Sequence, residues 1–298
     1  MQIKTIVCPV LKTWNSAKSV MLGDNLMGAD WHWALTMGQL IQKSAKELPK
    51  FKSMDHLLKH VSNNYHEYFC LIQKRQIEKM IKDASRMDAA GRRLLPEGAE
   101  EVLKANLKLL EKKNDANPVQ AGLFKQKREF GQTDLSIQDQ RYGHYGQQTL
   151  TKYKTDGLHE KFIEINGEKV LLKRITIDKQ FFITWGHCGD AYRKLKPHLN
   201  KLFKEFKALD KNNEDAVIEK AGEIYWLLAN ATPFRRGSAG IADVVQKILF
   251  ESKGLTLPPY KPEIKPDCEA ITRDLPDFLK NFKNMFDGKI AKQISLNG

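Results

Sequence analysis

Apolar residues recur three or four positions apart over most of the chain, and one short region in the middle instead has two runs rich in Ile, Val and Leu. Ser53 stands directly before the first of these stretches, where it can act as a helix N-cap. The apolar sets are Leu57, Leu58, Val61 and Tyr65; Val102, Leu103, Leu107 and Leu110; Leu195, Leu199, Leu202, Phe203 and Phe206; Val217, Ala221, Ile224, Tyr225 and Leu228; and Phe278, Leu279, Phe282 and Phe286. This spacing predicts amphipathic helices at both ends of the chain.

The exception lies in the middle. Asn166-Gly167 separates two runs rich in Ile, Val and Leu, which predicts a β-hairpin over residues 161–177 because both turn residues tolerate positive φ. The segments NDANPVQAG and GQTDLSIQDQRYGHYGQQ are polar and contain glycine, so we expect loops there. The predicted fold is mainly α with a small β element (α+β). A helical lobe would comprise residues 1–90 and 186–298, and a mixed α/β upper lobe would be inserted at 91–185.

Composition and charge narrow the function. The chain has 298 residues, of which 41% are hydrophobic, as in folded soluble proteins. Its net charge is +13, but most basic residues are lysines spread along the chain, which is typical of a solvated surface. No zinc-finger spacing, basic zipper or basic motif interleaved with aromatic residues is present, so nucleic-acid binding is a minor alternative.

The four cysteines (Cys8, Cys70, Cys188 and Cys268) show no metal-ligand spacing, which argues against a metal site and indicates a reducing compartment. The N-terminal apolar run is too short for a cleaved secretory signal, and no segment is apolar enough to span a membrane. Any export would therefore use a route that reads no cleaved signal.

The segment PFRRGSAG, residues 233–240, carries the clearest chemistry. It separates two predicted helices, the first ending near Asn230 and the second running from the glycine turn to Gly254. Gly237 and Gly240 would let the backbone approach a ligand, and the N-terminus of the second helix attracts anions. Arg236, and also Arg235, could add charged hydrogen bonds to a phosphate or diphosphate. The alternative is an ordinary turn in which Ser238 is an N-cap and the arginines are surface residues.

The stretch from EIYWLLANATPFRRGSAG to LPPYKPEIKPDCEAI resembles the avirulence protein B family of bacterial type III effectors, whose fold is related to the Fic proteins. Without a gap, Arg236 and Asp267 match the family's site arginine and aspartate. The resemblance implies a Fic-like helical lobe, a nucleotide or nucleotide sugar as ligand, delivery into host cytoplasm by a type III-like system, and transfer of a deoxyhexose to a hydroxyl of a host protein.

The Fic signature H-P-F-x-x-G-N-G-R lies over TPFRRGSAG, with Thr232 in place of the histidine and with Ser238 and Gly240 in place of the asparagine and arginine. AMP transfer by the usual Fic mechanism would therefore lack its general base. The predicted diphosphate-binding residues are Thr232, Arg235, Arg236, Gly237 and Ser238.

Asp267 is the candidate catalytic carboxylate, and its alternative is a helix-capping aspartate. His187 roughly matches a family site histidine; the alternative is a loop histidine that packs beside Trp185. The adjacent Cys188 as a nucleophile is a weaker alternative. A family site threonine has no clear match, although Tyr142, His144, Tyr145 and Thr149 lie in the segment where it would fall; the alternative is a mobile polar loop.

Two function classes follow from these residues. The first is a nucleotide-sugar-dependent glycosyltransferase that acts on a Ser or Thr hydroxyl of a host protein. The second is a nucleotide-binding pseudoenzyme or host-protein binding module without transfer activity. Fic-like AMP transfer by a non-standard base is a further alternative.

Overall fold

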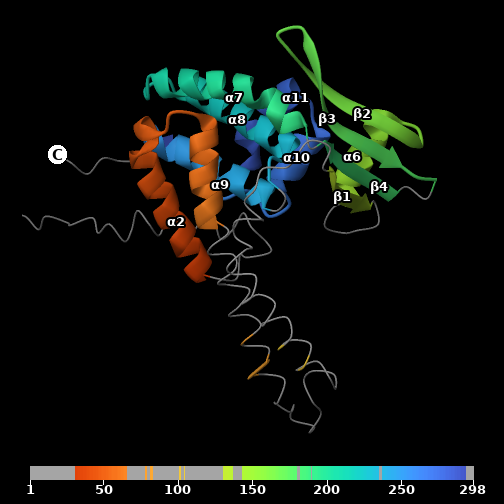
Figure 1. Ribbon diagram of the computed structural model, residues 1–298, viewed down its shortest axis with the longest axis horizontal. Coiled ribbons are helices and arrows are strands. Elements are labelled where there is room, and N and C mark those ends of the chain that lie inside the picture. Colours follow the sequence, from red (N-terminus) through yellow and green to blue (C-terminus); the bar gives the residue numbers. More distant parts are fainter. Residues whose placement is uncertain are drawn as a thin grey trace, which may run out of the picture.

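The computed structural model describes residues 31–65, 130–136, 143–179, 182–188, 190–234 and 237–292, with a few isolated helical positions between 78 and 104. Helices gather on one side of the molecule and a four-stranded sheet lies on the other (Figure 1). Within these residues the protein is mainly helical with antiparallel strands, as the apolar pattern predicts.

The helical side begins with α2 (Trp31–Lys46), the short 3-10 helix η1 (Leu48–Lys50) and a helical segment over 54–65. Ser53 caps that segment, because its Oγ accepts the His56 N–H at 3.2 Å. Next come α7 (Ala191–Ala208), α8 (Glu214–Ala231) and α9 (Ser238–Ser252), then α10 (Pro266–Thr272), α11 (Leu275–Phe282) and the 3-10 helix η2 (Lys283–Met285). A small pair, β5 (Leu255–Thr256) and β6 (Ala291–Lys292), is antiparallel.

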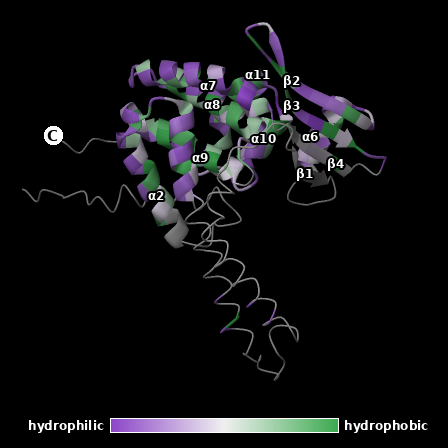
Figure 2. Cartoon of the chain, in the orientation of Figure 1, coloured by the Kyte–Doolittle hydropathy of each residue, from purple (hydrophilic) through white to green (hydrophobic). Residues whose placement is uncertain are grey.

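The apolar positions expected to face the core do so wherever they are described. Leu57, Leu58 and Val61 are fully buried, as are Leu195 and Leu199 of α7. Hydrophilic positions dominate the visible side of α7 (Figure 2). The predicted set from Val102 to Leu110 falls outside the described residues. Burial of one apolar stripe accounts for α7, whereas α8 is buried on all sides from Ile224 to Ala231 and α9 from Val244 to Phe250.

The predicted hairpin is present as β2 (Gly157–Ile165) and β3 (Glu168–Ile177). Its turn residues Asn166 and Gly167 have φ values of 51° and 78°, the left-handed pair that such a two-residue turn requires. The sheet is larger than the hairpin, since β1 (Phe130–Ser136) and β4 (Phe182–Cys188) join it in the order β1-β4-β3-β2.

The loop prediction for the polar segment before the hairpin is wrong. Part of it forms the edge strand β1, and another part forms α6 (Gly143–Tyr153). In α6, Tyr145 and Thr149 are buried one helical turn apart, with Leu150 and Tyr153 packed beside them, so a helical stripe exists that the glycines and glutamines obscure.

Helix α10 separates two apolar clusters. One cluster fills the helical lobe and includes Ala270, and the other joins α6 and the sheet through Cys268 and Ile271. Figure 1 shows α10 between the helices and the strands. The short helix that carries Asp267 is therefore one contact between the two parts of the fold, and α7 and α8 also pack against β3.

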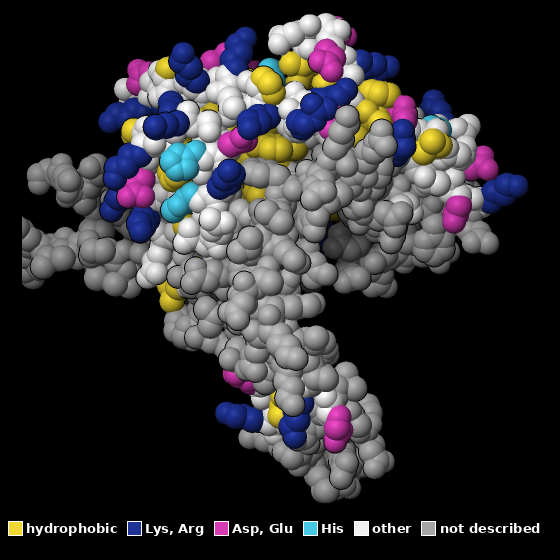
Figure 3. All heavy atoms as spheres, in the orientation of Figure 1, with side chains coloured by type: hydrophobic (Ala, Val, Ile, Leu, Met, Phe, Trp, Pro, Cys, Tyr) yellow, Lys and Arg dark blue, Asp and Glu magenta, His cyan; other side chains and the backbone are white. Residues whose placement is uncertain are grey.

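Basic and acidic side chains alternate on the surface around α7, as Figure 3 shows. Arg193 pairs with Asp190, Lys194 with Glu168, and Lys196 with Asp55. None of the helices in the described part of the chain has the length and apolar composition of a membrane span.

Candidate functional site

The turn between α8 and α9 has the boundaries expected from its sequence. Helix α8 ends at Ala231, and Thr232 follows as the C-cap in the left-handed region with φ 41°. Gly237, with φ 73°, is the N-cap of α9. Gly254 has φ 73° and follows the C-cap Lys253, where the sequence predicts the end of α9. Arg235 and Arg236 lie outside the described residues.

Ser238 fastens this turn. Its hydroxyl accepts the N–H of Phe234 at 2.9 Å and donates to the carbonyl of the same residue at 3.0 Å. Both bonds are buried, and Ser238 is the first residue of α9 rather than its N-cap. The hydroxyl thus closes the loop over 234–238, and the part of Ser238 that can meet an anion is its backbone N–H.

Gly240 is required by packing within the protein. A Cβ at this position would lie 2.2 Å from the Tyr65 hydroxyl oxygen, so α9 approaches the helical segment over 54–65 at a distance that only glycine allows. Tyr65 thus fills the Cβ direction of Gly240, and the approach of its backbone to a ligand stays a prediction.

Asp267 is the second residue of α10, following Pro266. The residue is half-buried, yet its carboxyl group is enclosed, and this burial raises the pKa of Asp267. The N–H groups of Cys268 and Asp267 and the nearby ammonium groups of Lys173 and Lys265 oppose the shift. The N-cap of α10 is Lys265, and Asp267 lies in the first turn, where the helix dipole favours a carboxylate. Its catalytic role stays a prediction.

Buried phenols and a second carboxylate surround Asp267. Burial raises the pKa values of Tyr225 and Tyr260, and Asp243 and Asp267 raise both further. Tyr260 donates to Gln246 Oε1 at 2.6 Å, and Asp243 pairs with Lys247. Among the described side chains, the Tyr225 hydroxyl and Asp243 Oδ1 are buried without a hydrogen-bond partner. The cluster thus has spare capacity to donate and accept hydrogen bonds.

His187 lies in β4, not in a loop as its alternative interpretation had it. It is paired with Lys173 of β3, and Lys173 is in turn paired with Lys161 of β2. Lys173 is fully buried and acts electrostatically on Asp267, so the sheet brings the row containing His187 to the start of α10. Nothing is described of the His187 side chain itself. Cys188 is half-buried and is the last residue of β4.

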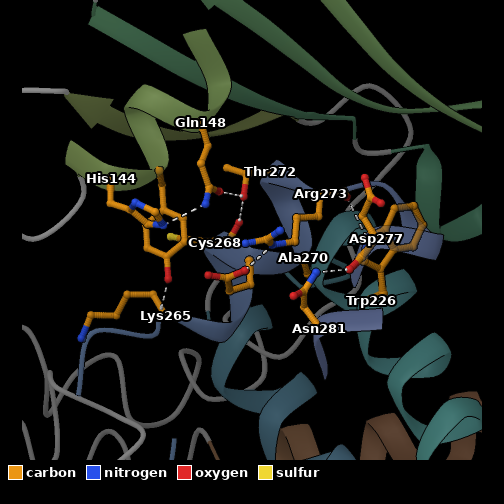
Figure 4. A network of polar contacts seen from close by, with 12 residues as sticks. His144, Gln148, Trp226, Lys265, Cys268, Ala270, Thr272, Arg273, Asp277 and Asn281 are labelled. Atoms are coloured by element: carbon orange, nitrogen blue, oxygen red, sulfur yellow. Dashed lines mark hydrogen bonds and ion pairs between the residues drawn. The ribbon is translucent and has the colours of Figure 1, made fainter. Parts of the chain in front are cut away.

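The upper-lobe candidates stand in an ordered helix rather than in a mobile loop. The Tyr145 hydroxyl accepts the N–H of Lys265 at 2.8 Å, and the Thr149 hydroxyl donates to the Tyr145 carbonyl at 2.9 Å. His144 is exposed, with its ring nitrogen 2.8 Å from Gln148 Nε2 (Figure 4). Tyr142 lies outside the described residues. Tyr145 is therefore a structural contact of α10.

The turn and Asp267 are joined through the end of α8. Asn230, two residues before Thr232, donates from Nδ2 to the carbonyl of Ala270 at 3.0 Å.

The described residues contain no group of three or more His, Cys, Asp and Glu side chains arranged to hold a metal ion.

Sequence reasoning missed Lys161, Lys173, Tyr225, Asp243 and Tyr260. The signal for Lys173 was its place in VLLKRITI, where a lysine interrupts a strand that is otherwise apolar on one face. Tyr225 falls on the apolar stripe of its helix, which predicts a core residue and gives no sign of its buried hydroxyl.

Comparison with known proteins adds a family relation to this geometry. Residues 185–289 match a family model described as avirulence protein, of the AvrB and AvrC type. The curated relative avirulence protein B of Pseudomonas savastanoi pv. glycinea is 27% identical over 102 residues, which cover 34% of this chain and 32% of the relative. The matched segment thus spans about a third of that protein. The resemblance seen in the sequence is confirmed over the segment that holds the turn and Asp267, and through residues 185–289 the chain is related to the avirulence proteins.

Proposed function

We propose that this protein is a bacterial effector that transfers a sugar, of the deoxyhexose or rhamnose type, from a nucleoside diphosphate donor to a Ser or Thr hydroxyl of a host protein. We further propose that it reaches the host cytoplasm through a type III-like secretion system. The observation that carries the proposal is the α8–α9 turn, a fixed helix N-terminus preceded by two residues in the left-handed region and joined through Asn230 to the helix of Asp267. The relation to avirulence protein B supports the effector part.

The turn suits a leaving diphosphate. In the transfer, the acceptor oxygen forms a bond to the anomeric carbon, the bond from that carbon to the phosphate oxygen breaks, and the diphosphate leaves with the electron pair. Negative charge therefore grows on the diphosphate in the transition state. The first N–H groups of α9 have no acceptor within their own helix, and the helix dipole places positive charge there. Together with Arg236 they would stabilise that charge.

The acceptor hydroxyl must lose its proton in the same step. Asp267 is suited to accept it, because an enclosed carboxylate with a raised pKa is a stronger base than an exposed one. Lys173, which favours the ionised carboxylate, would keep Asp267 available as the base in the resting protein. His187, in the row next to Lys173, is the second candidate for this proton.

The test is calorimetric titration with nucleoside diphosphates and nucleotide sugars, followed by mass spectrometry of candidate host proteins. Arg236→Ala should weaken nucleotide binding about 10–100-fold through the loss of one charged contact. Asp267→Asn should bind the donor but add no sugar to the acceptor. The control is Arg193→Ala. Arg193 is an exposed arginine of α7 paired with Asp190, and its substitution should change neither donor binding nor sugar transfer.

Two results would contradict the proposal in different ways. Donor binding that is equal in wild type and Arg236→Ala would remove the turn as the diphosphate site. Tight capture of a host protein, with no mass added to it by the wild type, would instead favour a binding module or a nucleotide-binding pseudoenzyme.

A further inference from the structure

Two buried lysines lie next to each other on the face of the sheet that meets α10. Lys161 of β2 and Lys173 of β3 are directly paired, and their exposed fractions are 4% and 0%. A bulge sets this arrangement. Phe162 pairs with Leu171 while Lys161 pairs with Lys173, so Leu172 is the extra residue and the two consecutive residues Leu172 and Lys173 are both buried.

Lys161 binds the end of α10. Its Nζ donates to three backbone carbonyls, those of Ala270 at 3.0 Å, Ile271 at 2.8 Å and Arg273 at 2.8 Å. The last carbonyls of a helix have no partner inside the helix, and a cation is favoured beside them. Burial lowers the pKa of Lys161, but three carbonyl acceptors favour its ammonium form, which alone has three hydrogens to donate. The Nζ also lies 4.7 Å from the centroid of the Trp226 ring, a second contact that favours the charge.

Residues of α8 complete this contact. Trp226 Nε1 donates to the Arg273 carbonyl at 3.0 Å, and Asn230 Nδ2 donates to the Ala270 carbonyl at 3.0 Å. Lys161 thus shares two of its three acceptors with the helical lobe, and it is the sheet's contribution to a joint grip on the C-terminal end of α10.

Helix α6 contacts both ends of α10. Tyr145 accepts from the N–H of Lys265, just before the helix, and the Thr272 hydroxyl donates to Gln148 Oε1 at 3.1 Å (Figure 4). Helix α10 has seven residues, so few hydrogen bonds of its own fix its direction. The direction in which Asp267 points therefore depends on these outside contacts.

We propose that Lys161 is a positioning residue of the candidate site: by tying the C-terminal carbonyls of α10 to the sheet, it fixes the direction of the Asp267 carboxylate. The effect on catalysis rests on the proposed function, whereas the effect on α10 does not. Lys161 does not touch the substrate in this assignment and acts through the helix backbone.

The test compares Lys161→Met with Lys169→Met in the full chain. Lys169 is the matched control, an exposed lysine of β3 whose Nζ lies 4.2 Å from the centroid of the Phe162 ring. Hydrogen exchange of the amides over 268–273 should be at least tenfold faster in Lys161→Met and unchanged in the control. Amides in the middle of α8 should keep their protection in both, which separates local loosening from global unfolding.

Kinetics give the second readout. Lys161→Met should lower kcat for sugar transfer at least tenfold, while Kd for a nucleoside diphosphate changes less than threefold because the α8–α9 turn is intact. If Lys161→Met does not fold, Lys161→Arg replaces it. The guanidinium keeps the charge and the hydrogen-bond donors but changes their positions. We therefore expect amide exchange over 268–273 and kcat to lie between the values of wild type and those of a variant without the Lys161 contacts.

The proposal would be overturned if the amides over 268–273 exchanged at the wild-type rate in the folded Lys161 variants. Faster exchange of α10 with wild-type kcat would also overturn it, because Asp267 would then not need a fixed helix. If the wild-type protein neither binds nucleotide nor transfers a sugar, the proposed function fails. The exchange experiment alone then decides whether Lys161 fixes α10.

Discussion

Substitution of Gly240 by alanine tests whether this glycine serves packing or ligand binding. Gly240 is the third residue of α9, and an added Cβ would lie 2.2 Å from Tyr65 Oη, 2.8 Å from Cζ and 3.0 Å from Cε2. Carbon and oxygen atoms in contact need more than 3 Å, so either the Tyr65 ring or α9 must move by close to an ångström. Tyr65 is 6% exposed, which leaves its ring little room to move.

The size of the effect follows from two opposing contributions. Overpacking a core by one carbon costs about 1–3 kcal/mol, and the short distances here favour the upper half of that range. Alanine is a better helix former than glycine by up to about 1 kcal/mol. The free energy of unfolding should therefore fall by about 1–2 kcal/mol in Gly240→Ala, as measured by urea denaturation.

Two further variants sharpen the test. Gly222→Ala in α8 is the control, because the nearest atom to its Cβ is Leu279 Cδ2 at 3.0 Å, the end of a flexible side chain, and its loss should be smaller. Tyr65→Phe combined with Gly240→Ala removes the oxygen but leaves Cζ at 2.8 Å, so part of the stability should return. Unchanged stability of Gly240→Ala together with lost nucleotide binding would refute the packing argument and assign the glycine to the ligand.

Two other variants probe the same region. Ser238→Ala removes the hydroxyl that bonds both the N–H and the carbonyl of Phe234, and it should lower the free energy of unfolding by about 1–3 kcal/mol in urea denaturation; an unchanged value would show that the hydroxyl does not hold the turn closed. Because burial raises the pKa of Asp267 in the folded state, the native protein binds that proton more tightly, and stability falls as pH rises between the unfolded and folded pKa values. Asp267→Asn should therefore be more stable than wild type at pH 7, with the gain disappearing toward about pH 4, and a gain independent of pH would contradict this cause.

The helical lobe could be predicted because its information is local. An apolar stripe repeats every three or four residues, Ser53 caps one helix, and Gly254 ends another. The hairpin could be predicted for the same reason, because Asn-Gly is a residue pair that favours positive φ, and Asn166 and Gly167 both have it. Strand β1 was missed because its partner β4 is some fifty residues further on, and its own sequence, FGQTDLS, is largely polar.

The turn at the candidate site was predicted in its boundaries but not in the use of its side chains. Proline and glycine mark where α8 ends and α9 begins, and these marks are local. The roles of Ser238 and Gly240 depend on what lies opposite them. The Ser238 hydroxyl bonds the backbone of Phe234, and Gly240 contacts Tyr65, which lies 175 positions earlier in the chain.

The paired buried lysines, Lys161 and Lys173, could not be predicted for a different reason. Strict alternation along β3 places Lys173 on the face of Ile175 and Ile177 and Leu172 on the opposite face, so burial of both is not expected from the sequence. The bulge at Leu172 allows both to be buried, with Lys173 near Asp267, while Lys161, its partner, holds the other end of α10. A bulge changes which face every later residue takes, and its position depends on the pairing of two strands. The carboxylate of the candidate site is thus read from the sequence, but the sheet that orients its helix is not.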